Sequence, residues 1–157
     1  MDKITIERIA KAHPIIRVEL LNDYLEINKQ LPAGVRLRFT SVYRTNAEQD
    51  ILYNQKPKVT NAKGGQSIHN YGLAFDIVIL IDEDKNGTFE KAVWAGKYFD
   101  FVVEKLKSKG YDWGGDWNRF KDNPHFQVKK ADGTSWSWRE LSKKKTIIVN
   151  DIKYPII

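Results

Sequence analysis

The first part of the chain changes from a helical to an alternating pattern of apolar residues. Apolar side chains recur at roughly helical spacing over residues 4–30, and Pro14 divides this stretch into two predicted helices. Residues 35–44, VRLRFTSVYR, alternate and predict a strand. Residues 45–55 predict a helix, since Thr45 and Glu48 have the spacing of a capping box.

An unbroken apolar run follows a polar, glycine-bearing loop. Residues 74–81, AFDIVILI, predict a buried central strand, and the sequence DEDKNG at 82–87 predicts a turn. We expect one helix over residues 88–109, ended by Gly110. Its expected core positions are Val93, Trp94, Phe101, Val102 and Leu106.

The last part of the chain predicts short strands. An aromatic-rich loop over residues 111–124 precedes a strand at 125–130, and residues 146–157 predict two strands around a tight turn. The order of elements predicts an α+β fold, in which helices pack on a small, largely antiparallel central sheet. The length of 157 residues predicts a single domain, 1–157, with no linker or internal repeat.

Composition and charge narrow the chemistry. The chain has no cysteine, which excludes disulfides, thiolate catalysis and cysteine-based metal sites. A net charge of +6 favours an anionic partner, but no basic run interleaves with aromatic residues as in a nucleic-acid groove. We therefore expect no nucleic-acid partner, and a monomer.

The N-terminal sequence, MDKITIERIAKAHPII, is too charged for a secretory signal peptide, and no apolar run is long enough to span a membrane. We expect synthesis in the cytoplasm and no membrane span. A role outside the cell would then require release by another route.

One short stretch combines a histidine and an aspartate around a glycine. Asp76 enters the buried strand, where an unpaired carboxylate is costly. His69 lies seven residues earlier, and Gly72 permits a bend that would bring the two side chains together. An arginine or a helix N-terminus would satisfy Asp76 equally well.

A third candidate ligand opens the next strand. His125 would complete a set of two histidines and one carboxylate, which is a known zinc ligand set that leaves a position for water. Asp122, three residues earlier, is placed to act as a general base. His13 has no acidic partner of suggestive spacing and is interpreted as structural or as a surface residue.

These residues resemble a known family. SIHNYGLAFDI resembles the Ser-x-His-x-x-Gly-x-Ala-x-Asp pattern of zinc D-Ala-D-Ala carboxypeptidases and L-Ala-D-Glu endopeptidases, and DNPHF and SVYRT resemble its two other segments. The most similar branch is that of phage endolysins and bacterial autolysins, in which the base is typically aspartate. The resemblance spans about residues 41–130; residues 131–157 form a C-terminal extension outside it, with a predicted β-hairpin.

The resemblance implies a fold like that of Hedgehog and D-Ala-D-Ala peptidases. It implies that His69, Asp76 and His125 bind zinc and that Asp122 activates water and protonates the leaving amine. It also implies that Arg44 holds the scissile carbonyl or the oxyanion; a surface arginine or a salt-bridge partner is the alternative.

The roles of several further residues have two interpretations. Ser67 would hydrogen-bond near the site or serve only the turn. Trp113, Trp117 and Phe120 would line a peptide groove or pack their loop, and Asp112 and Asp116 are rival bases.

The turn after the central strand resembles the start of a calcium loop, with Gly87 at its sharp bend. Val93 stands where such a loop has its bidentate glutamate, so an acidic turn is the alternative. The candidate calcium ligands are Asp82, Asp84, Asn86, Thr88 and Glu90.

The resemblance thus predicts a zinc metallopeptidase of peptidoglycan stem peptides that acts on the anionic cell wall, with the L-Ala-D-Glu bond as its expected target. Two alternatives stay open. One is a D-Ala-D-Ala carboxypeptidase or dipeptidase, and the other is a zinc-bearing binding domain without turnover.

Overall fold

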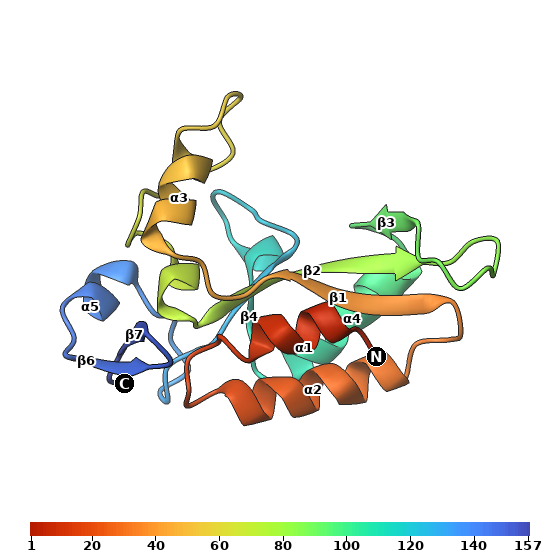
Figure 1. Cartoon of the computed structure of the whole chain (residues 1–157), viewed down its shortest axis with the longest axis horizontal. Helices are drawn as coiled ribbons and strands as arrows, with labels where there is room; N and C mark the ends of the chain where they lie inside the picture. Colours follow the sequence, from red (N-terminus) through yellow and green to blue (C-terminus); the bar gives the residue numbers. More distant parts are fainter.

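The computed structural model describes residues 1–157 and has an α+β fold, as predicted (Figure 1). Its helices are α1 (Lys3–Ile9), α2 (Arg17–Lys29), α3 (Asn46–Tyr53), α4 (Lys97–Ser108) and α5 (Trp138–Ser142), with 3-10 turns η1 (Ile68–Tyr71) and η2 (Gly114–Asp116). Its strands are β1 (Val35–Ser41), β2 (Ala74–Ile81), β3 (Lys91–Val93), β4 (Asp112–Trp113), β5 (His125–Gln127), β6 (Thr146–Val149) and β7 (Ile152–Pro155).

Strand β2 is the centre of a five-stranded antiparallel sheet. Strand β1 pairs along one edge of β2, while β5 pairs with its first half and β3 with its second half on the other edge. Strand β4 adds to the far side of β5. The apolar run therefore forms the central strand that the sequence predicts.

The two faces of β2 have different roles. Phe75, Ile77 and Ile79 are fully buried in one hydrophobic cluster with side chains from α1, α2 and α4, the helices that lie along the sheet (Figure 1). Because successive side chains of a strand point to opposite faces, Asp76 lies on the face away from this cluster, with Val78. A strand anchored on one face thus presents a carboxylate on the other.

The helix predicted over residues 88–109 is wrong in its first half. Residues Lys91–Val93 form β3 instead, because they pair with the otherwise free backbone groups of Ile79–Ile81. Helix α4 begins only after Gly96, and Trp94, predicted in the core, is 52% exposed. Tertiary pairing thus prevails over the local helical pattern, and α5 is a further helix that the sequence pattern did not indicate.

Residues 146–157 contain an antiparallel hairpin, in which Asn150 and Asp151 adopt the positive φ angles of a tight turn. The hairpin is tied to the segment after α1. The Tyr154 hydroxyl donates to the carbonyl of Lys11 at 2.7 Å, and Nε2 of His13 lies 2.7 Å from the carbonyl oxygen of Pro155. His13 is buried and has this structural role.

The structure contains no helix with the length and apolar character that a membrane span requires.

Gly72 ends η1 and lets the chain turn into β2. Its φ of 72° lies in the left-handed region. Its carbonyl oxygen accepts a hydrogen bond from the backbone N–H of His13 at 2.9 Å. A Cβ atom at this position would lie 2.6 Å from the His13 nitrogen and 3.1 Å from the Tyr154 ring. The turn therefore requires glycine for two reasons, backbone conformation and space.

We expect Gly72→Ala to lower the free energy of unfolding by about 3 kcal/mol, the sum of left-handed strain and the backbone clash. Gly133 is a matched control, since its φ is 83° and its Cβ position is open. Gly133→Ala should cost only about 1 kcal/mol. Urea unfolding of both variants measures the difference, and equal losses would contradict the close packing at Gly72.

Candidate functional site

Asp76 and His125 are neighbours across the sheet. They are direct partners in the antiparallel pairing of β2 with β5, so their side chains lie on the same face. Oδ1 of Asp76 lies 3.3 Å from Nδ1 of His125. The short strand β5 is thus enough to fix the histidine against the carboxylate.

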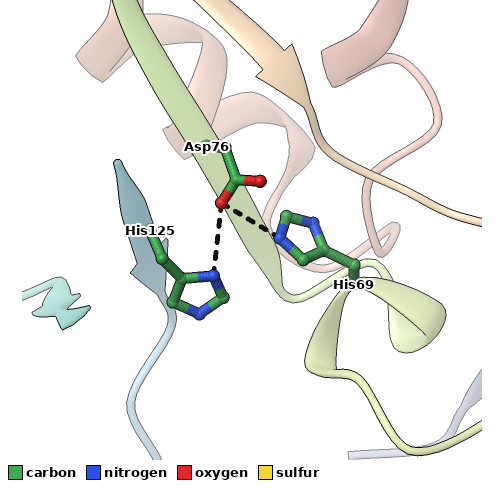
Figure 2. A group of neighbouring side chains, drawn as sticks. All are labelled: His69, Asp76 and His125. Carbon is green, nitrogen blue, oxygen red and sulfur yellow. Dashed lines mark hydrogen bonds and ion pairs between the residues drawn. The ribbon is translucent and has the colours of Figure 1, made fainter. Parts of the chain in front are cut away.

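His69 reaches the same oxygen from a separate segment. It lies in η1, and its Nε2 is 3.2 Å from Oδ1 of Asp76 (Figure 2). Ligand atoms of His69, Asp76 and His125 all lie within 4.8 Å of one another. The structure therefore brings together the three predicted metal ligands, and the bend at Gly72 is what permits it.

Each histidine is oriented through its other ring nitrogen. Nδ1 of His69 lies 2.8 Å from the carbonyl oxygen of Val42, and Nε2 of His125 lies 2.9 Å from Oε1 of Gln127. The sequence interpretation missed Gln127, although its place two residues after His125 in a strand puts it on the same face. These partners favour one tautomer for each ring, with the nitrogen nearest Asp76 free of its proton.

The charges of the site act on one another strongly. Burial opposes the charge of Asp76, but His69 and His125 together hold the pKa of its carboxyl far below its usual range. Burial likewise opposes the charge of His125, but the hydrogen bond and the charge of Asp76 raise the pKa of its imidazole. Asp76 and His125 therefore stabilise each other's charged forms.

Arg44 approaches the second oxygen of Asp76. Its Nη2 lies 3.7 Å from Oδ2 of Asp76 and donates to Ser41 Oγ at 3.0 Å, while Nη1 donates to Gln49 Oε1 at 2.8 Å. Arg44 is thus a salt-bridge partner of the site rather than an unattached surface residue. Gln49, which is buried, is a second residue that the sequence interpretation missed.

Asp122 lies beside the three ligands on the loop before β5. The backbone N–H of His125 donates to its carbonyl at 3.1 Å, and the side chain reaches solvent. Desolvation, and then the negative charge of Asp76, raise the pKa of its carboxyl, while His125, His69 and Arg44 oppose this rise. A carboxyl group with a raised pKa next to a candidate metal site has the properties of a general base.

The rival bases are engaged elsewhere. Asp116 pairs with Nζ of Lys107 at 2.6 Å, and Asp112 accepts hydrogen bonds from Trp117 and from the Ser135 hydroxyl. Because these contacts occupy Asp112 and Asp116, Asp122 is the better candidate for the general base.

Of the remaining predicted residues, Ser67 and Trp113 have structural roles, and Trp117 lies against the site. Ser67 caps η1, accepting from the backbone N–H of His69 at 3.3 Å, which is the role of a turn residue. Trp113 packs its loop, since its Nε1 donates to the Asn123 carbonyl at 2.7 Å and its ring stacks on the buried Phe126. The ring of Trp117 lies 5.2 Å from that of His125, against the site itself.

The acidic turn after β2 brings ligand oxygens of Asp82, Asp84 and Glu90 within 4.8 Å of one another. Asp82 accepts from the backbone N–H groups of Asn86 and Gly87, and the Asn86 amide oxygen accepts from the N–H of Thr88 at 2.7 Å. These hydrogen bonds are those of an acidic turn. Calcium binding by Asp82, Asp84, Asn86, Thr88 and Glu90 stays a prediction.

Comparisons with known proteins find similarity to one family model and to named peptidases. Residues 60–128 match the family model described as D-alanyl-D-alanine carboxypeptidase. The chain is 40% identical over 109 residues to the peptidoglycan L-alanyl-D-glutamate endopeptidase CwlK of Bacillus subtilis, over 60% of this chain and 62% of the relative. It is 32% identical over 102 residues to the L-alanyl-D-glutamate peptidase of a Listeria phage, over 64% of this chain and 34% of the relative.

The chain thus spans about three fifths of the first relative and about a third of the second. The fold is that of the Serratia marcescens L-Ala D-Glu endopeptidase ChiX, with a TM-score of 0.59 and 21% identity over 84% of this chain and 91% of that one. His69, Asp76, Asp122 and His125 all lie within the matched residues. The segment that contains them therefore matches the D-alanyl-D-alanine carboxypeptidase family model, in agreement with the resemblance of its motifs.

Proposed function

We propose that this protein is a zinc peptidase that hydrolyses the L-Ala-D-Glu bond of peptidoglycan stem peptides. The observation that carries the proposal is the convergence of His69, Asp76 and His125, with Asp122 beside them. Both curated relatives are named for this bond, which supports it over other bonds of the stem.

The donor set fits zinc. Two imidazoles and one carboxylate form a common catalytic zinc set, and the set contains no sulfur. The hydrogen bonds of His69 with Val42 and of His125 with Gln127 occupy the outer nitrogens, which leaves the inner nitrogens near Asp76 Oδ1 available to a metal ion. A cation held by all three residues would pair with the buried charge of the Asp76 carboxylate.

The hydrolysis assigns a role to each remaining group. Bound zinc would supply a Lewis acid that polarises the scissile carbonyl and makes water more acidic. Asp122 accepts the proton of the attacking water as the new C–O bond forms, and donates it to the leaving amine as the C–N bond breaks. The guanidinium of Arg44, directed toward this site, stabilises the negative charge that develops on the carbonyl oxygen.

The overall charge suits an anionic wall. A net charge of +6 favours association with a polyanionic surface, and we propose that the protein reaches the wall after release from the cytoplasm and acts there as a monomer. A D-Ala-D-Ala carboxypeptidase is the second candidate function, because the matched family model carries that description.

Zinc-loaded protein incubated with defined muropeptides should release fragments with a new N-terminal D-glutamate, detected by mass spectrometry. Release of free D-alanine would instead support the carboxypeptidase. Absence of any cleavage at stoichiometric zinc would contradict both activities.

Asp122→Ala serves as the control in the same assay. It should retain zinc and fold but lose about 10²–10⁴-fold in rate, because a positioned acid–base group contributes that much. A binding domain without turnover would bind its ligand equally well with and without Asp122.

Gln127→Leu should bind Zn²⁺ about 10–100-fold more weakly, because His125 loses the acceptor that orients its ring. Gln127→Glu is the matched control, since it retains an acceptor and should stay close to the unmodified protein. Competition with a chromogenic chelator measures both affinities. Unchanged affinity in a folded Gln127→Leu variant would show that Gln127 does not position His125.

A further inference from the structure

A large cavity adjoins Asp122. Its volume is about 720 Å³, and it lies between the loop after α3, the loop after η2 and the start of α5. In Figure 1 these segments lie on the side of the molecule where β2 begins, the end that carries Asp76. The residues of α5 that line the cavity, Trp138 and Arg139, fall outside the segment that matches the family model.

The walls of this cavity are partly apolar, and two of their apolar side chains are exposed to solvent. Phe120 is 80% exposed and Val59 is 59% exposed, and both line it. Phe120 also has a φ of 54°, a conformation that is strained for a bulky residue. Exposed apolar side chains gathered around a hollow are typical of a ligand-binding surface.

The charges at the cavity are predominantly positive. Lys121 and Arg139 line it with Asp122, and neither cation has an acidic partner. Lysines nearby are paired: Lys107 with Asp116 and Lys130 with Glu140. The guanidinium of Arg139 lies 4.5 Å from the ring centre of Trp138, a stacking that restrains it while its donors remain free.

We infer that this cavity holds the part of the stem peptide that follows the cleaved bond, and that Arg139, assisted by Lys121, binds a free carboxylate there. The inference rests on the proposed function. A glutamate has two carboxyl groups, so a D-glutamate joined onward through one of them retains the other. A planar guanidinium suits such a carboxylate because it donates two parallel hydrogen bonds. Arg139 of the C-terminal extension would therefore select the substrate, while the residues that cleave it lie in the segment that matches the family model.

Three synthetic peptides test this inference and distinguish the two sources of the carboxylate. The first is L-Ala-γ-D-Glu-meso-diaminopimelate in which, as in the other two, the C-terminal carboxyl is an amide and the glutamyl and side-chain carboxyl groups are free. The second is amidated at the glutamyl carboxylate, and the third at the diaminopimelate side-chain carboxylate. For the unmodified zinc-loaded protein, one of the two amidations should raise KM about tenfold with kcat nearly unchanged, as for loss of one charge-assisted hydrogen bond.

Arg139→Gln should raise KM for the free peptide to the value of the sensitive amide and abolish the preference, while Arg139→Lys should keep part of it. Lys29→Gln, on α2 and outside the cavity, removes the same charge and should leave the preference intact. Arg139 is exposed, so we expect the substitutions to leave the melting temperature unchanged. A change in KM could then not arise from loss of the fold.

Equal KM values for all three peptides, or an unchanged preference in Arg139→Gln, would overturn the inference and leave the proposed function standing. No cleavage of any peptide would overturn the proposed function and the inference together.

Discussion

The structure depends on a carboxylate held within the central strand of its sheet. Asp76 points away from the hydrophobic cluster that fixes its neighbours Phe75 and Ile77. Such a carboxylate is costly to desolvate unless it is paired. Here His69 and His125 meet at one of its oxygens and Arg44 approaches the other, so the strand that anchors the fold also fixes the candidate site.

Rigid surroundings explain why three ligands from distant segments can meet at one point. Cross-strand pairing fixes His125 against Asp76, and the left-handed turn at Gly72 returns His69 to the same face. Groups outside the ligand set, Val42 and Gln127, then determine which nitrogen of each ring faces the carboxylate. A metal site needs this outer support to hold its ligands in place.

The sequence predicted which three side chains converge, but it did not predict every element around them. His69, Asp76 and His125 could be found because ligand residue types and a glycine stand at informative spacing along the chain. The helix expected from residue 88 failed because the pairing of β3 with β2 is a tertiary effect that no local pattern contains. Arg139 could not be connected to Asp122 from the sequence, since only the folded chain brings α5 to the loop before β5.

The central claim is that His69, Asp76 and His125 together hold one zinc ion. X-ray absorption at the zinc edge of protein loaded with one equivalent tests it most directly. The account predicts two imidazole nitrogens and oxygen donors at about 2.0–2.2 Å. His125→Ala should remove one of the two imidazole contributions. A spectrum without imidazole scattering, or one unchanged by that substitution, would contradict the account.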